Sequence, residues 1–195
     1  QMGLFMDGDG IPLAFNITAG NTNEQTTLTP LEEKILKDFE LSKFIVCTDA
    51  GLASNANRKF NDKQDRAFIT TQSIKKLKKH LMEWALDKSG WKLTNDSKSY
   101  NISDIDKNEE SYKDKIFYKE RWIKENGLEQ ALIVTYSIKY KNYQQKIREK
   151  QIERARKALN SKNLKLDKVN QNDFKRFITT TNITEDGEIA EKKVY

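Results

Sequence analysis

The sequence has a single cysteine, Cys47, and a single histidine, His80. With one cysteine, no disulfide can form within the chain, which fits a reducing compartment. Cys47 falls in a short apolar run, so we expect a small buried side chain rather than a reactive thiol. His80 lies among lysines in a predicted helix, and no other Cys or His accompanies it, which argues against a zinc site.

Long apolar segments are also missing. No stretch approaches the ~20 apolar residues that a membrane-spanning helix requires, and the N-terminus has no signal-peptide pattern. Charged residues make up 33% and hydrophobic residues 36% of the 195 residues. We therefore expect a soluble, cytoplasmic protein with no membrane partner, long enough for one large domain or a domain with an insertion.

Several catalytic motifs are absent as well. There is no Ser-His-Asp set with a nucleophile elbow. Gly8-Asp9-Gly10 lacks the rest of a dinucleotide fingerprint, and no Walker lysine pattern occurs. The net charge of +6 favours a polyanionic partner, with nucleic acid first. What remains is a site of carboxylates and metal acting on an anionic substrate.

The most informative stretch begins with residues 44–47, an apolar run of strand formers that predicts a strand buried on both faces. Asp49 follows at its C-terminal end, Gly51 allows a sharp turn, and Ser54 can cap a helix that begins near Asn55. A carboxylate held at a strand end suits a Mg²⁺ ligand. A turn-forming or helix-capping aspartate is the alternative for Asp49 at this point.

The elements around this strand predict a mixed sheet. Residues 1–6 and 11–18 form a hairpin candidate whose turn, Asp7-Gly8-Asp9-Gly10, fully explains Asp7 and Asp9. A helix is expected from the mid-twenties to Glu40, with Pro30 either in its first turn or at a kink. Residues 67–71 read as another strand. The order β-β-α-β-α-β favours helices on the faces of a mixed sheet.

After Gln72 the composition becomes more basic and polar. The sequence predicts a basic helix over 73–86, a polar loop over 87–115, and strands at 116–123 and 131–136. A helix over 139–160 should follow, and then strands at 174–183 and 188–195 joined at Asp186-Gly187. The acidic segment 104–110 is expected to be solvated. Tyr140 and Tyr143 are expected on the apolar face of the long helix.

Two groups of basic residues could contact DNA. The first basic group is Lys75, Lys76, Lys78 and Lys79, and the second is Arg148, Lys150, Arg154, Arg156 and Lys157. Phosphate contact along a nucleic-acid backbone is one interpretation. A solvated helix with internal pairs such as Glu153 with Lys157 is the other. The three tryptophans and seven tyrosines could stack on bases, although core packing is the expected fate of most of them.

A series of blocks resembles one known family: Gln1-Met2-Gly3-Leu4-Phe5-Met6-Asp7, Gly10-Ile11-Pro12-Leu13, Gly20-Asn21-Thr22 with Glu24, Thr27-Leu28-Thr29-Pro30, Thr48-Asp49-Ala50-Gly51-Leu52 with Ser54 and Asn57, Ile69-Thr70-Thr71-Gln72-Ser73, Leu132-Ile133-Val134-Thr135-Tyr136-Ser137 and Ile147-Arg148-Glu149. In order and spacing these blocks resemble bacterial insertion-sequence transposases of the DDE (Asp-Asp-Glu) type. The resemblance spans most of the chain and is most specific over residues 1–57.

The resemblance implies an α/β fold, a ribonuclease-H-like mixed sheet with flanking helices, interrupted by a large α+β, β-rich insertion. Residues 1–72 would be a partial ribonuclease-H-like catalytic core, and residues 73–195 an insertion subdomain with basic helices and strands. In this family two aspartates and one glutamate bind two Mg²⁺ ions. The ions activate a water or a DNA 3′-hydroxyl and stabilise the leaving oxygen in phosphodiester displacement.

Asp49 is similar to the second aspartate of that set and is the catalytic and metal-binding residue we expect. By the family's layout, the first aspartate would precede Gln1 and the glutamate would follow Tyr195, with Glu149 as the alternative inside the chain. We therefore expect this segment to hold one of three carboxylates and to be inactive alone. The full-length protein would cut and rejoin double-stranded DNA, at element ends and target, in the bacterial cytoplasm near the nucleoid, with a homodimer possible.

Two other functions stay open. A non-catalytic DNA-binding remnant of a transposase would keep the basic helix and have no use for Asp49. A ribonuclease-H-like nuclease without strand transfer would share the site, and only its products would distinguish it.

Overall fold

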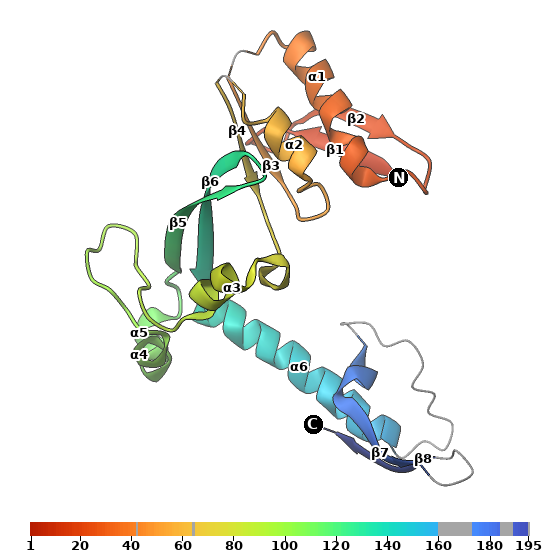
Figure 1. Ribbon diagram of the computed structural model, residues 1–195, viewed down its shortest axis with the longest axis vertical. Coiled ribbons are helices and arrows are strands. Elements are labelled where there is room, and N and C mark those ends of the chain that lie inside the picture. The colour runs from red at the N-terminus through yellow and green to blue at the C-terminus, as the bar shows by residue number, and fades with distance from the viewer. Residues whose placement is uncertain (42, 64, 160–172, 184–188, 195) are drawn as a thin grey trace. The chain divides into compact units, whose positions relative to one another are not determined.

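The computed structural model describes residues 1–41, 43–63, 65–159, 173–183 and 189–194, and Figure 1 labels their helices and strands. The chain divides into two compact units. Unit 1 consists of Gln1–Asp87 and Glu120–Ile133, and unit 2 of Lys88–Lys119 and Val134–Tyr195. Within the described ranges, no helix is long and apolar enough to cross a membrane.

Unit 1 begins with the predicted hairpin, in which β1 (Met2–Met6) pairs antiparallel with β2 (Pro12–Ile17). In the turn, Asp7 Oδ1 accepts hydrogen bonds from the backbone N–H of Asp9 at 3.0 Å and of Ile11 at 2.8 Å. Gly10 has φ +84°, a conformation that glycine adopts without strain. The interpretation of Asp7 as a turn residue is confirmed.

The predicted helix from the mid-twenties to Glu40 is two elements, the 3₁₀ helix η1 (Glu24–Thr26) and α1 (Leu28–Asp38). Pro30 is the third residue of α1, where the backbone N–H has no acceptor within the helix, so it neither kinks nor breaks the helix. Glu40 has φ +50°, and a left-handed residue at this place ends an α-helix.

The strand that precedes Asp49 is β3 (Phe44–Thr48), as predicted, and it pairs in parallel with β4 (Arg66–Thr70). The chain crosses between them through α2 (Asn55–Phe60). Parallel pairing brings the C-terminal ends of both strands to the same edge. Because Asp49 directly follows β3, it lies at the edge where open α/β sheets bind their ligands.

The core of unit 1 lies between α1 and β3. Leu31 and Ile35 of α1 are buried together with Phe44 and Val46 of β3. The ring of Phe5 in β1 stacks on that of Phe44, with 5.7 Å between the centroids. Both strand pairs of unit 1 therefore contribute to one apolar cluster.

The expectation that β3 is buried on both faces is wrong. Successive side chains of a strand point to opposite faces, and here Ile45 is 66% exposed and Cys47 is exposed as well. Cys47 is therefore not the buried core residue that we expected. The cause is that α1 covers only the face that carries Phe44 and Val46.

The mixed α/β character is confirmed, but the described strands do not form one continuous mixed sheet. They form separate two-stranded sheets, which are β1-β2, β3-β4, β5-β6 and β7-β8. A resemblance in sequence indicates which elements occur, whereas sheet continuity requires hydrogen bonds between neighbouring strands.

One carboxylate is buried beside the core of unit 1. Both oxygens of Glu32 accept hydrogen bonds from Nδ2 of Asn61, each at 3.0 Å, and both residues are buried. Burial raises the pKa of Glu32, against the opposing effects of this hydrogen bond and of the Arg66 charge. The pair connects α1 to the C-terminal end of α2.

The basic helix predicted over 73–86 is wrong as a single element. It consists of the 3₁₀ helix η2 (Ile74–Lys76) and of α3 (Lys79–Leu86). Leu77 and Lys78 between them have ψ values of 151° and 150°, which are extended rather than helical. Lysine spacing alone does not reveal such a break.

The strands predicted near 116–123 and 131–136 are confirmed as β5 (Phe117–Glu125) and β6 (Leu128–Tyr136), which pair with each other. Their turn is Asn126-Gly127, with φ values of 53° and 78°. Two positive φ angles in an Asn-Gly pair are typical of a type I′ hairpin turn, a signal that our sequence analysis missed. The division between the units falls within this hairpin.

In unit 2, the segment predicted as a loop over 87–115 contains α4 (Ile102–Lys107) and α5 (Glu109–Tyr112). Trp91, Ile105 and Phe117 are buried. The rings of Tyr100 and Tyr112 pack edge-on against Phe117, at 5.2 and 5.5 Å between centroids. These scattered aromatic residues order a polar segment that lacks a regular apolar period.

The long helix is confirmed as α6 (Ile138–Leu159). Ala155 is completely buried, but Tyr140 and Tyr143 are 64% and 59% exposed. These two tyrosines therefore do not form the buried face that the 3.6-residue period predicted.

The last elements are η3 (Phe174–Phe177), β7 (Ile178–Ile183) and β8 (Ile189–Val194), and the two strands pair antiparallel as predicted. The first strand begins at residue 178 rather than 174, because a helical turn precedes it. The predicted turn at Asp186-Gly187 lies outside the described residues.

Candidate functional site

The backbone at the end of β3 is tied to β4. Thr48 Oγ1 donates a hydrogen bond to Thr70 Oγ1 at 3.0 Å, and Thr70 Oγ1 donates to the carbonyl oxygen of Asp49 at 3.2 Å. The N–H of Thr71 also donates to the carbonyl oxygen of Thr48 at 3.3 Å. These bonds continue the strand pairing up to Asp49, so its backbone is held on a regular scaffold.

Asp49 uses one of its two carboxylate oxygens in the turn that follows. Oδ1 accepts hydrogen bonds from the N–H of Gly51 at 2.8 Å and of Leu52 at 3.3 Å. The side chain is exposed, and within the described part of the chain Oδ2 has neither a hydrogen bond nor an ion pair. The alternative of a turn-forming aspartate is thus correct for Oδ1, while Oδ2 stays available for a ligand.

The loop after Asp49 is fixed by Ser54 and Asn57. Ser54 Oγ accepts a hydrogen bond from the N–H of Asn57 at 3.1 Å, which confirms the predicted cap of α2. Asn57 is 5% exposed, and its Nδ2 donates to the carbonyl oxygens of Leu52 and Gln25, each at 2.9 Å. One buried amide therefore holds this loop against η1. Sequence reasoning missed this role, although Asn57 belongs to the blocks that carried the family resemblance.

A second carboxylate lies beside Asp49, on η1. If Gly51 carried a Cβ, that atom would lie 3.1 Å from Asp49 Oδ1 and 3.3 Å from Glu24 Oε2. Both distances are shorter than ordinary van der Waals contact, so a larger residue at position 51 would have to displace one of the two carboxylates by a few tenths of an ångström. Sequence reasoning included Glu24 in the blocks that carry the family resemblance and gave it no further role.

The donor set at this edge suits a hard divalent cation, because Mg²⁺ and Mn²⁺ prefer carboxylate oxygens. Asp49 Oδ2 is free to coordinate, and Gly51, which has no side chain, leaves the space between the carboxylates unfilled. In the described ranges, no group of three or more His, Cys, Asp or Glu residues is arranged to enclose a metal. The chain therefore offers part of a coordination shell at Asp49.

The first basic group lies on η2 and at the start of α3, and all four of its lysines are exposed. Lys78 forms an ion pair with Glu125 at 3.0 Å, and Lys79 lies 3.9 Å from Glu83. For Lys75 and Lys76, no ion pair is found among the residues that the structure describes. These two lysines are thus the less neutralised half of the group.

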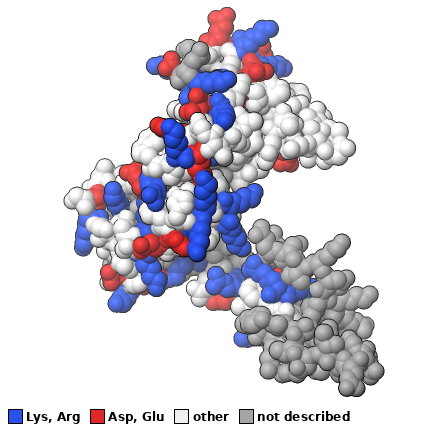
Figure 2. All heavy atoms as spheres, viewed as in Figure 1, with Lys and Arg blue, Asp and Glu red and all other residues white. Residues whose placement is uncertain are grey.

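The second basic group lies on α6, and all five of its members are exposed. Lys157 is paired with Glu153 at 2.7 Å, as the alternative interpretation of this helix predicted. No ion pair involves Arg148 or Arg154 within the described ranges. Figure 2 shows lysine and arginine side chains interspersed with acidic ones over the described residues.

The tryptophans differ in their surroundings. Trp91 is 2% exposed and packs on Tyr136, with 5.7 Å between ring centroids. Trp84 lies under the guanidinium of Arg121 at 5.3 Å. Trp122 is 77% exposed, so it is the tryptophan that is accessible for base stacking.

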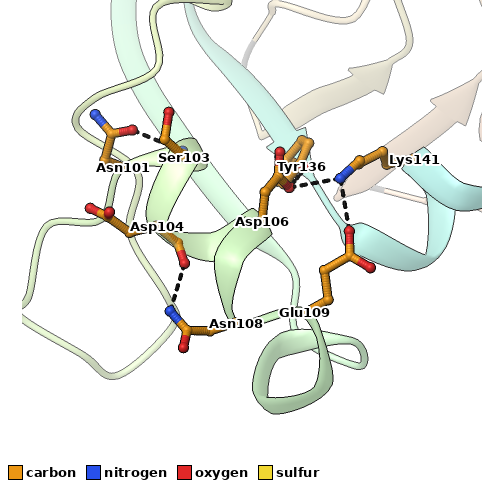
Figure 3. Close-up of polar contacts among 8 residues, drawn as sticks. All are labelled: Asn101, Ser103, Asp104, Asp106, Asn108, Glu109, Tyr136 and Lys141. Carbon is orange, nitrogen blue, oxygen red and sulfur yellow. Dashed lines mark hydrogen bonds and ion pairs between the residues drawn. The ribbon is translucent and has the colours of Figure 1, made fainter.

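The start of α6 is anchored by a polar cluster, which Figure 3 shows in close-up. Tyr136 donates a hydrogen bond to Asp106 Oδ1 at 2.5 Å, and Lys141 Nζ lies 3.1 Å from Asp106 and 2.9 Å from Glu109. Burial and the Asp106 bond raise the pKa of Tyr136 to about 12. The hydrogen bond to Glu109 raises the pKa of Lys141, and partial burial opposes it.

This cluster corrects a prediction. The acidic segment 104–110 is not a solvated loop, because Asp106 and Glu109 are paired with a lysine of α6. Asn101 caps α4 by accepting a hydrogen bond from the N–H of Ser103 at 2.9 Å. Asp106 and Glu109 therefore attach α4 and α5 to α6.

Comparison with known proteins gave one match. A family model described as the transposase DDE domain matches residues 1–132, which include the complete loop at Asp49. Neither the search of curated proteins nor the search of solved structures found a match.

Proposed function

The chain belongs to the transposase DDE-domain family, and from that premise we propose that Asp49 binds a catalytic divalent metal ion in DNA cleavage and strand transfer. Membership implies a DNA substrate, and transposases of this kind act with divalent metal ions. Mg²⁺ is the ion we propose. The observation that carries the proposal is the position of Asp49, at the C-terminal end of β3, with Oδ1 fixed by the turn and Oδ2 free.

The protein's own contribution is to hold a carboxylate oxygen in a fixed place. The Thr70 bond holds the backbone of Asp49, and the Gly51 and Leu52 N–H groups fix the rotation of its side chain. Because the side chain is exposed at a sheet edge, a phosphodiester can approach it. A bound divalent ion would lower the pKa of an attacking water or 3′-hydroxyl and stabilise the leaving oxygen.

We further propose that the exposed cations of the two basic groups bind the DNA backbone, with the three arginines Arg148, Arg154 and Arg156 the best suited on α6. Their lack of ion pairs within the described ranges supports this, because a guanidinium without a carboxylate partner is available for phosphate. Lys157 is less suited to binding phosphate, since it already forms an ion pair with Glu153.

The test uses the protein in its native reading frame, with a DNA substrate that carries the ends of the element encoding it. Asp49→Asn should reduce Mg²⁺-dependent nicking and strand transfer at least about 1000-fold, because a neutral amide is a poor metal ligand. Its affinity for the same DNA should change by less than about threefold. Asp9→Asn is the matched control, because Asp9 lies in the β1–β2 turn.

Paired substitution of Arg148 and Arg154 by Gln should give the opposite profile. DNA affinity should fall, and the slope of log affinity against log salt should decrease by about 0.9 for each lost phosphate contact. Lys157→Gln is the control on the same helix. If Asp49→Asn leaves nicking and strand transfer intact, Asp49 is not a catalytic ligand. If DNA binding is the sole activity of every variant and of the native protein, the DNA-binding alternative replaces our proposal.

A further inference from the structure

Glu24 and Asp49 are far apart in sequence but lie close together in space. A Cβ atom added to Gly51 would lie 3.1 Å from Asp49 Oδ1 and 3.3 Å from Glu24 Oε2. Gly51 does not have the positive φ angle that favours glycine, so what glycine supplies at this position is space. Asp49 and Glu24 therefore border the same small space at one edge of the sheet.

Several hydrogen bonds hold Glu24 in this place. Asn23 caps η1 by accepting a bond from the N–H of Gln25 at 3.1 Å, and Thr27 Oγ1 donates to the carbonyl oxygen of Glu24 at 2.8 Å. The buried Nδ2 of Asn57 joins Gln25, next to Glu24, to Leu52 in the turn of Asp49. The backbone segments that carry the two carboxylates are therefore held close to each other.

No cation of the described residues pairs with either carboxylate, in contrast to Asp106 and Glu109 of unit 2. Two carboxylates that border the same space repel each other. A divalent cation removes this repulsion, and its preferred ligands are the free oxygens present here.

We propose that Glu24 is a second ligand of the divalent ion that Asp49 binds, which adds a carboxylate from η1 to the site. This inference rests on the proposed function, since it takes Asp49 as a metal ligand. The other possible role of Glu24 is a favourable interaction with the helix dipole, because it is an acidic residue in the first turn of η1. That role alone predicts a small loss of stability on substitution and no change in metal affinity.

The test measures Mn²⁺ binding by the complete 195-residue chain, from the electron paramagnetic resonance signal of free Mn²⁺. Glu24→Gln should weaken binding about tenfold, in the range known for residues that support a metal site. Glu33→Gln is the matched control, because Glu33 is an exposed glutamate of α1. Asp49→Asn should also weaken binding.

A second variant removes no ligand. Gly51→Ala keeps both carboxylates and places a methyl group between them, so we expect it to weaken Mn²⁺ binding by a similar factor. Circular dichroism confirms that each variant is folded. If Asp49→Asn weakens binding while Glu24→Gln and Gly51→Ala match the wild type, the role of Glu24 is refuted and the proposed function stands. If Asp49→Asn itself has no effect, the metal site of the proposed function fails.

Discussion

Two pairs of carboxylates in this chain have the same chemistry and opposite surroundings. In unit 2, Asp106 and Glu109 share Lys141, and Asp106 also accepts the hydroxyl hydrogen of Tyr136 (Figure 3). In unit 1, Asp49 and Glu24 flank the space above Gly51, and no described cation pairs with them. The first pair shares a lysine of the protein and serves to attach helices. The second keeps free oxygens, as a metal site requires.

The partners of a carboxylate, rather than its clustering in sequence, thus indicate its role. Residues 104–110 form the denser acidic segment, yet two of its members, Asp106 and Glu109, attach α4 and α5 to α6. Glu24 and Asp49 are far apart in sequence, and they meet because Asn57 joins η1 to the loop after β3.

The largest expected difference between the pairs is in stability. Lys141→Met leaves Asp106 and Glu109 without their cation and should lower the free energy of unfolding by about 1–2 kcal/mol, because these groups are only partly exposed. Urea unfolding followed by tryptophan fluorescence measures this, since Trp91 packs on Tyr136. Lys146→Met, an exposed position of α6, is the control. Equal losses in both variants would show that the cluster does not anchor α6.

Added metal should stabilise the protein through the Asp49–Glu24 pair and not through the Asp106–Glu109 pair. Asp49→Asn should change the free energy of unfolding by less than about 0.5 kcal/mol, because an amide oxygen can still accept the Gly51 and Leu52 hydrogen bonds. Addition of about 10 mM MgCl₂ should stabilise the wild type and Lys141→Met, but not Asp49→Asn, since binding to the folded state stabilises it. An unchanged metal response in Asp49→Asn would place the ion elsewhere.

The smallest effect concerns pH and Tyr136. Burial and the bond to Asp106 raise its pKa from about 10 to about 12, so the folded state favours the protonated phenol. Its contribution is complete below pH 10 and is lost as the pH rises through 12. The free energy of unfolding should therefore fall more steeply between pH 10 and 12 in the wild type than in Tyr136→Phe. Tyr100, whose pKa is also about 12 because of Asp96, is present in both proteins and cancels. Parallel profiles would contradict the assignment.

Local signals predicted much of unit 1. The run Phe44–Cys47 gave a strand, Ser54 gave the start of α2, and the Asp-Gly pairs gave the β1–β2 turn, because each depends on neighbouring residues alone. The position of Asp49 at a strand end followed from the same signals.

What the sequence did not predict depends on contacts between distant residues. The closeness of Glu24 to Asp49 arises from hydrogen bonds of Asn57 to two separate segments. Exposure of Cys47 depends on which face of β3 α1 covers, and the packing of Tyr100 on Phe117 joins aromatic residues that are scattered along the sequence. The Asn126-Gly127 turn is different, since its signal was local and was missed.

The central claim is that the edge of unit 1 at Asp49, and not the acidic cluster of unit 2, binds a divalent metal ion. Iron-mediated cleavage tests it most directly. Fe²⁺ bound in place of Mg²⁺ generates radicals with ascorbate and peroxide, and these cut the backbone close to the ion. We predict fragments from cuts near Glu24 and Asp49, identified by mass spectrometry, suppressed by excess Mg²⁺ and absent in Asp49→Asn. Cuts centred on Asp106 and Glu109, or a pattern unchanged in Asp49→Asn, would contradict the account.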